Sequence, residues 1–268
     1  MKRFVLLLVL AISTTAFAGV TFTSTSQTEQ NGKTSKTRVK ASVSGQNARI
    51  EFLENEDDPI FTPGRYLLSR DGGKTMYLVD PAQKTLSPID FTEITKEMTA
   101  TMQRLNVKAS VGAPKMTKVL DLPGKPVAGL ATRHYRYQTQ YTTTLEVLGQ
   151  KTGIETAVTD DLWTTKALVD PALGVWLRKE AVSTGDANAD ALLKSEMSKA
   201  SGFPVKRVTV TTTSDDHGHK STSTTSMEIL EAQVTAVPAS AFVTPADYRQ
   251  VPLPVPDDAD DEHESHTH

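Results

Sequence analysis

The chain has 268 residues, no cysteine and a net charge of −3, with 29 Lys and Arg against 32 Asp and Glu. The lack of cysteine excludes disulfides, thiolate catalysis, cysteine-ligated metal sites and a lipid-modified N-terminal cysteine. Acidic residues are concentrated after Pro256, so the rest of the chain is nearly neutral and has no electrostatic reason to bind nucleic acid.

Residues 1–18 have the pattern of a secretory signal peptide. Lys2 and Arg3 precede an apolar run, and Ala16-Phe17-Ala18 is a small-x-small cleavage motif. The apolar run, Phe4 to Ile12, is too short to cross a bilayer of roughly 30 Å as a helix. We therefore expect cleavage after Ala18 and a periplasmic or secreted protein without a membrane anchor. A retained anchor is the alternative.

The next part of the chain alternates apolar and polar residues with period two, which is typical of half-buried strands. The alternation predicts a hairpin of strands 39–43 and 48–52, a second hairpin of strands 66–70 and 75–79, and a strand at 84–89. Gly72-Gly73-Lys74-Thr75 resembles part of a phosphate-binding loop, but the first glycine of that motif is missing and a strand follows instead of a helix. The two glycines therefore predict a type I′ hairpin turn.

Two segments switch to the three- and four-residue spacing of an amphipathic helix. The first covers 91–105, where Asp90 and Glu93 resemble a capping box, and its apolar stripe consists of Phe91, Ile94, Met98, Met102 and Leu105. The second covers 187–199, and Ser201-Gly202 ends it. Each apolar stripe must be buried against another surface, and the apolar face of the sheet is the candidate.

Strands resume at 132–148, 154–165 and 173–182, and a last hairpin follows with strands 205–213 and 221–232. Residues 251–268 are rich in Pro and Asp and are predicted to be disordered. No strand-helix-strand alternation supports a parallel sheet. The predicted fold is mainly β with two α-helices: one domain over 19–250, in which a curved antiparallel sheet forms a half-open barrel covered by helices.

Three stretches resemble an uncharacterised, domain-of-unknown-function family of bacterial exported proteins whose fold is like that of the lipoprotein carriers LolA and LolB. They are ARIEF (48–52), RYLLSRDGGKTMYLVDPAQKTL (65–86) and SAFVTPADYRQVP (240–252). The resemblance implies an unclosed antiparallel barrel wrapped over helices, in some members with an apolar cavity. It also implies that a Phe and a Pro-x-x-Tyr anchor the end of the sheet. It implies no reaction, and no lipoprotein-handling residue of LolA is carried over.

The best candidates for ligand binding are aromatic residues and the methionines of the first helix. Tyr135, Tyr137 and Tyr141 share one face of a predicted strand, where their rings could line a cavity or pack as core under the helices. Trp163 and Trp176 face the same choice. Met98 and Met102 on the first helix would complete an apolar site. We expect the ligand to be apolar or lipid-like.

The histidines are the only candidate metal ligands. His263, His266 and His268 lie among carboxylates of the tail, and imidazole with carboxylate can hold Zn²⁺, Ni²⁺ or Cu²⁺. A solvated acidic tail is the alternative. No nucleophile elbow, H-E-x-x-H motif or dinucleotide loop is present, so we predict no enzyme and no cofactor. The leading hypothesis is a non-enzymatic periplasmic binding or carrier protein. Low-affinity metal binding and a structural or interaction module of the cell envelope are the alternatives.

Overall fold

The computed structural model describes residues 18–55, 58–170, 172–174, 184–199 and 201–254. Their main element is one sheet of thirteen strands, accompanied by helices α1 (Phe91–Arg104) and α3 (Ala187–Ser198) and a 3-10 turn η1 (Ala239–Phe242). The strands are β1 Ala18–Gln30, β2 Lys33–Ser44, β3 Asn47–Asn55, β4 Tyr66–Ser69, β5 Met76–Asp80, β6 Thr85–Ile89, β7 Val107–Val111, β8 Lys115–Val127, β9 Leu130–Val147, β10 Gln150–Thr165, β11 Phe203–Asp215, β12 Lys220–Ala236 and β13 Arg249–Gln250. The prediction of a mainly β fold with two α-helices is confirmed.

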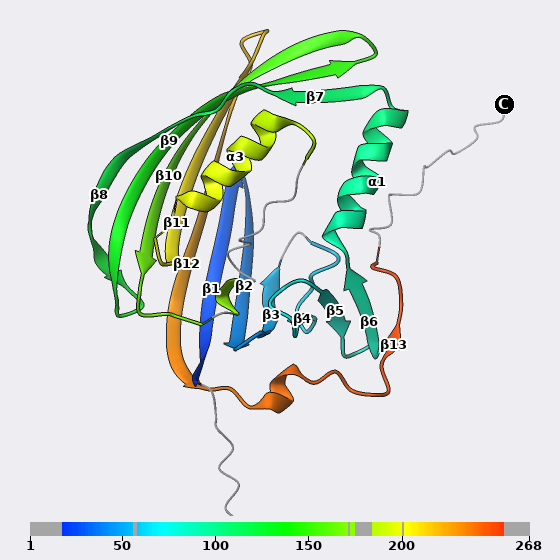
Figure 1. Cartoon of the computed structure of the whole chain (residues 1–268), viewed down its shortest axis with the longest axis vertical. Helices are drawn as coiled ribbons and strands as arrows, with labels where there is room; N and C mark the ends of the chain where they lie inside the picture. The colour runs from blue at the N-terminus through cyan, green and yellow to red at the C-terminus, as the bar shows by residue number, and fades with distance from the viewer. Residues whose placement is uncertain (1–17, 56–57, 171, 175–183, 200, 255–268) are drawn as a thin grey trace, which may run out of the picture.

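The sheet is curved and does not close into a barrel (Figure 1). Its order is β13-β6-β5-β4-β3-β2-β1-β12-β11-β10-β9-β7, and β8 also pairs with β9. Every pairing is antiparallel except that of β13 with β6. Strand β1 pairs with β12, from Ala18 opposite Ala236 onwards, so an N-terminal and a C-terminal strand meet in the middle of the sheet. The antiparallel, half-open sheet predicted from alternation is therefore confirmed.

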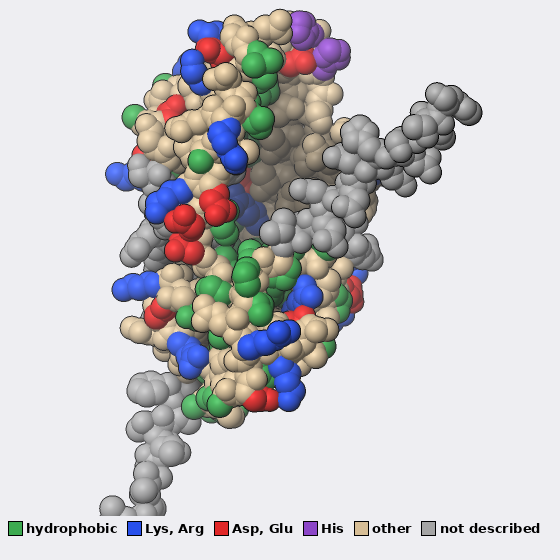
Figure 2. Space-filling model, turned by 90° about the vertical axis from the view of Figure 1, so that its right-hand side faces the viewer, with side chains coloured by type: hydrophobic (Ala, Val, Ile, Leu, Met, Phe, Trp, Pro, Cys, Tyr) green, Lys and Arg blue, Asp and Glu red, His purple; other side chains and the backbone are tan. Residues whose placement is uncertain are grey.

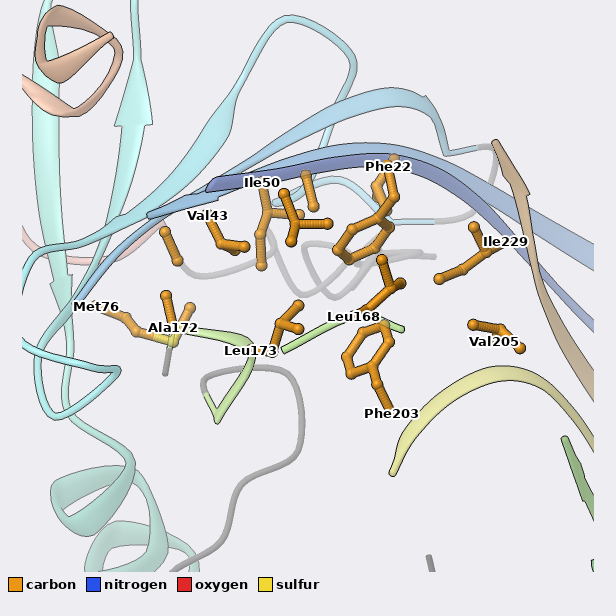
Figure 3. Packing of buried hydrophobic residues seen from close by; sticks show 14 of the residues in the cluster. Phe22, Val43, Ile50, Met76, Leu168, Ala172, Leu173, Phe203, Val205 and Ile229 are labelled. Carbon is orange, nitrogen blue, oxygen red and sulfur yellow. The ribbon is translucent and has the colours of Figure 1, made fainter. Parts of the chain in front are cut away.

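The main hydrophobic core lies on the concave face of one half of the sheet. Phe22, Ile50 and Phe203 point from the strands toward the segment that follows β10 (Figure 3). Leu168, Ala172 and Leu173 of that segment are buried against them. The segment that follows β10 thus fills part of the concave side of the sheet, which the sequence did not indicate.

The other half of the concave face is polar. Inward positions of β11 and β12 carry Thr211, Thr213, Ser223 and Thr225, which are only partly buried. Figure 2 shows a hollow on the open side of the molecule, walled largely by tan atoms, which are backbone and uncharged polar side chains. Threonine accordingly favours strands here without supplying a dry core.

The end of the chain covers the outer face of β3 to β6. Phe242 is buried with Tyr66, Leu68 and Val79, and Tyr248 packs against this cluster. The anchoring role that the resemblance implied for these two aromatic residues is thus confirmed.

The described part of the predicted tail 251–268 is ordered along β6. Val251 N donates to Leu86 O at 3.0 Å, and Ser87 Oγ donates to Pro252 O at 3.0 Å. Leu253 packs against the main core. The predicted boundary at 251 is therefore too early, because backbone hydrogen bonds to β6 extend past it. Residues 255–268 lie outside the described part.

The helices begin and end close to the predicted boundaries but are held differently. Helix α3 crosses the concave face, and α1 connects β6 with β7 on the open side (Figure 1). Ile94 and Leu105, from the predicted stripe of α1, are 43% and 61% exposed. Asp186 caps α3, because its carboxylate accepts hydrogen bonds from the backbone N–H groups of Asn188 and Ala189. Among the described residues, no helix combines the length and apolarity needed to cross a membrane.

Several local predictions differ from the structure. The Gly72-Gly73 turn has positive φ at both glycines, as predicted, but the loop runs from Arg70 to Thr75 because the Asp71 carboxylate accepts the Thr75 N–H at 3.0 Å. Strands β1, β7, β8 and β13 were not predicted. Leu173 and Gly174 form a helical turn instead of starting a strand, and 175–182, with Trp176, lies outside the described residues. The predicted signal peptide also falls almost wholly outside them.

Candidate ligand-binding cavity

A cavity of about 450 Å³ lies on the concave face between β10, β11, β12, the end of α3 and the segment after β10. Most of its lining is apolar, and one side is charged. The apolar residues include Leu162, Leu168, Leu173, Met197, Phe203 and Met227, and the charged ones are Asp160, Asp170, Glu196, Lys199 and Arg207. The cavity therefore offers an amphipathic lining.

Asp160 is the centre of the charged side and is fully buried. Its carboxylate accepts hydrogen bonds from Arg207 Nε at 2.8 Å, Arg207 Nη2 at 2.7 Å, Thr209 Oγ1 at 2.9 Å and Lys199 Nζ at 3.2 Å. Strand register explains the arrangement: Asp160 lies opposite Thr209, and Arg207 is the next inward residue of β11. Three of the four hydrogen bonds to the Asp160 carboxylate thus come from β11, and only that of Lys199 comes from outside the sheet.

Helix α3 joins this network through its last turn. Lys199 Nζ lies 2.6 Å from Glu196 Oε1, and Arg207 Nη2 lies 3.1 Å from Glu196 Oε2. The Tyr137 hydroxyl donates to Lys199 O at 2.6 Å. Two carboxylates and two cations therefore balance one another, which is the condition for burying charges at tolerable cost.

Asp160 and Arg207 stabilise each other's charged forms. Burial alone would raise the pKa of Asp160. The hydrogen bonds and positive charge of Arg207, together with the charge of Lys199, lower this pKa by more than burial raises it, so it lies below the usual range. Burial lowers the pKa of Arg207, and Asp160 and Glu196 more than reverse this. A carboxylate that already accepts four hydrogen bonds is a weak base, so the arrangement suits binding better than proton transfer.

The predicted tyrosines lie next to this cavity without lining it. Tyr135 and Tyr137 are 7% and 8% exposed and pack with Leu162 and Met116. Leu162, which packs with both tyrosines, lines the cavity, and the Tyr137 hydroxyl reaches the end of α3 at Lys199 O. Tyr141 is half-buried beside a second hollow of about 640 Å³.

The other predicted ligand-binding residues are not brought together with the tyrosines. Trp163 stacks on His134 with ring centroids 4.1 Å apart, and both face the outer side of the sheet because their strand neighbours Leu162 and Tyr135 face inward. Met102 is half-buried on α1, and the side chain of Met98 lies outside the described part.

The predicted metal ligands His263, His266 and His268 lie outside the described residues. Within residues that the structure does describe, no three His, Asp or Glu side chains are placed to share a metal ion. His219 Nδ1 lies 2.9 Å from Asp215 Oδ2. The tail therefore remains a predicted site.

None of the five charged residues that line the cavity was predicted as a site residue from the sequence. Adjacent Asp160 and Asp161 point to opposite faces, as expected of strand neighbours, and Asp161 pairs outside with His134 at 2.6 Å and Arg136 at 2.9 Å. The available signal was Asp160 itself. Asp160 is one of the alternate residues of β10 that face the concave side, and the others are the uncharged residues Ile154, Thr156, Val158 and Leu162.

Similarity to solved structures is distant. The chain is similar to the LolA superfamily protein NE2245 from Nitrosomonas europaea, with 9% identity over 84% of this chain and 90% of that chain and a TM-score of 0.31. It is also similar to an outer membrane lipoprotein-sorting protein domain from Vibrio parahaemolyticus, with 10% identity, 84% and 89% coverage and a TM-score of 0.28. A DUF1329 family protein from Desulfovibrio piger matches with 10% identity, 85% and 91% coverage and a TM-score of 0.28. Scores this low carry no argument about ligand or activity.

Comparison with the curated proteins gives no match. The family model of DUF4412, a domain of unknown function, matches residues 17–248. This match spans most of the chain and confirms the predicted resemblance to a domain-of-unknown-function family. The chain belongs to the DUF4412 family.

Proposed function

We propose that the protein is a non-enzymatic binding or carrier protein of the cell envelope and holds an apolar or lipid-like ligand in the cavity beneath α3. The observation that carries the proposal is the cavity itself. Its volume of about 450 Å³ falls within the roughly 300–1,000 Å³ of small-molecule sites. Its apolar side chains would bury hydrocarbon, and its charged side would orient a polar end.

Helix α3 supports this proposal because polar contacts hold it at both ends. Near its start, Asn188 Nδ2 donates to Val111 O at 2.8 Å and Val111 N donates to Asp186 Oδ2 at 3.1 Å. Near its end, Glu196 and Lys199 make the ion pairs described above. None of the described residues of α3 itself is buried. Displacing α3 to admit a ligand would therefore expose little apolar surface of the helix, and its main cost would be opening the buried contacts of Lys199.

An envelope location is part of the proposal and rests on the signal-peptide pattern of residues 1–18. The apolar ligand would come from the same compartment. Nothing in the charged network requires a reaction, since each carboxylate there already accepts hydrogen bonds from cations.

The test is uptake of cis-parinaric acid by a cavity-filled variant and a matched control. Met227 lines the cavity, and its strand neighbour Ser226 faces the other side of the sheet. We expect Met227→Trp to weaken probe binding at least about tenfold, because the indole occupies the space of the hydrocarbon, and Ser226→Trp to leave it unchanged. Gly174→Leu is a second filling variant, because a Cβ at Gly174 meets no atom within 4 Å.

Native mass spectrometry of the purified wild-type protein gives the independent readout. A co-purified mass that organic solvent extracts as lipid would support the proposal. Equal probe binding by wild type, Met227→Trp and Gly174→Leu would overturn it, as would a wild-type protein that binds no probe and carries no lipid.

A further inference from the structure

Three exposed aliphatic residues lie at one end of the sheet, where α1 leads into β7. Leu105 is 61% exposed, Val147 is 45% exposed and Leu148 is 79% exposed. They lie close together because Val107 of β7 is the register partner of Val147, the last residue of β9 (Figure 1). We call this cluster, Leu105, Val147 and Leu148, the apolar tip.

Leu148 also has an unfavourable backbone conformation. It forms the two-residue turn between β9 and β10 with Gly149, at φ values of 51° and 84°. This is the geometry of a type I′ turn, in which Asn-Gly is preferred because bulky side chains disfavour positive φ. The β1–β2 hairpin of the same sheet uses Asn31-Gly32 at φ values of 52° and 75°. A leucine here therefore costs stability in two ways, through strain and through exposure of apolar surface.

Cations flank the apolar tip. Lys108 and Lys151 are 76% and 69% exposed, and both approach Glu146, at 3.2 Å and 3.7 Å. Arg104 ends α1 just before Leu105. Across the four charged residues Arg104, Lys108, Glu146 and Lys151, positive charge exceeds negative.

The end of the neighbouring β11–β12 hairpin carries two further acids, Asp215 and Asp216, and one further cation, Lys220, so counting it still leaves one net positive charge. Asp216 accepts a hydrogen bond from Gly153 N at 2.5 Å, and Asp215 accepts one from His219 N at 2.9 Å. The side chains of Lys108 and Lys151 are mostly exposed, so anions in solution can reach them.

We infer that the apolar tip docks on the surface of an anionic lipid bilayer. Aliphatic side chains at a hairpin end can enter the boundary between headgroups and acyl chains, while neighbouring Lys and Arg contact anionic headgroups. A second protein is a poorer fit, since stable protein interfaces bury about 800 Å² per partner and three side chains cannot supply that area. The inference stands independently of what the cavity binds.

The experiment is co-sedimentation with vesicles of phosphatidylethanolamine and phosphatidylglycerol, compared with vesicles of phosphatidylcholine alone. The key variant is Leu148→Asn, because asparagine tolerates the turn geometry and should keep or raise thermal stability while removing the apolar side chain. We expect it to lower the vesicle partition coefficient about tenfold. The control is Val234→Asp. Val234 is an aliphatic residue that is 61% exposed, and it lies near the C-terminal end of β12, away from the apolar tip.

The charge contribution is tested with the double variant Lys108→Gln, Lys151→Gln. We expect it to abolish the preference for phosphatidylglycerol vesicles and to lose the salt dependence of binding. Every protein compared carries the same N-terminal segment, so the contribution of that segment cancels.

The inference is overturned if Leu148→Asn binds vesicles as wild type does, or if Val234→Asp loses as much binding. Absence of wild-type binding to the anionic vesicles would also overturn it. The inference is also overturned if the wild type forms dimers without lipid and Leu148→Asn is monomeric, because a second copy of the chain would then cover the tip.

Discussion

Replacing Asp160 with asparagine tests whether the charged side of the cavity holds the fold together. Asp160→Asn keeps the shape of the side chain but leaves Lys199 and Arg207 without their shared carboxylate. Lys199 matters most, because its side chain is only 2% exposed and cannot turn to water, whereas that of Arg207 is 39% exposed. Removing one partner of a buried ion pair costs about 3–5 kcal/mol.

The lower end of that range applies here. Glu196 remains 2.6 Å from Lys199 and keeps part of the compensation. We therefore expect a loss of about 3 kcal/mol in the free energy of unfolding, which for a chain of this size lowers Tm by roughly 6–12 °C. Urea unfolding followed by circular dichroism measures it. The matched control is Asp161→Asn, which alters the neighbouring outward-facing carboxylate and should cost under about 1 kcal/mol.

The pH dependence supplies a second readout. The pKa of Asp160 is lowered in the folded state, so its contribution to stability is complete above its unfolded pKa of about 3.9 and is lost as the pH falls below it. We expect the wild type to lose this stability increment below about pH 4 and Asp160→Asn to lack that part of the slope. Equal losses from Asp160→Asn and Asp161→Asn at neutral pH would refute the reasoning.

Two further predictions concern the end of the chain. Phe242→Ala should cost about 3–5 kcal/mol in the free energy of unfolding, because Phe242 is buried in the outer cluster, whereas Val243→Ala, at a residue 57% exposed, should cost little; equal midpoints in urea would contradict this. A chain that ends at residue 255 should lose most of the Zn²⁺ binding of the full chain if the tail histidines are ligands, and identical calorimetric isotherms would exclude them.

Strands whose residues alternate strictly between polar and apolar could be predicted from the sequence, because a strand with one exposed and one buried face shows a hydrophobic period of two. Strands β2 and β3 are examples. Strand β8 was not predicted because Pro123, Gly124 and Pro126 interrupt its alternation, and its register with β9 shifts twice. An edge strand needs hydrogen bonds on one side only, so it tolerates prolines that a central strand would not.

The candidate site could not be predicted because its residues come from three elements that only the fold brings together. Asp160, Lys199 and Arg207 each look like an ordinary charged residue in the sequence. Their meeting depends on the register of β10 with β11 and on where α3 ends. The tyrosine row was placed correctly on one face of its strand, but the strand pattern does not reveal which inward residues are covered by Leu162 and α3.

The pairing of β1 with β12 has a consequence for how the chain reaches its folded state. Thr23 Oγ1 donates a hydrogen bond to Glu231 Oε1 at 2.8 Å across 208 positions of sequence. A ribosome delivers β1 first and β12 nearly last, so the two halves of the sheet cannot join until synthesis is almost finished. During that interval one edge of β1 has no partner, and the outer cluster of Tyr66, Leu68 and Val79 lacks Phe242, which the closing segment carries. Completion of the sheet is therefore delayed by topology until β12 has been made.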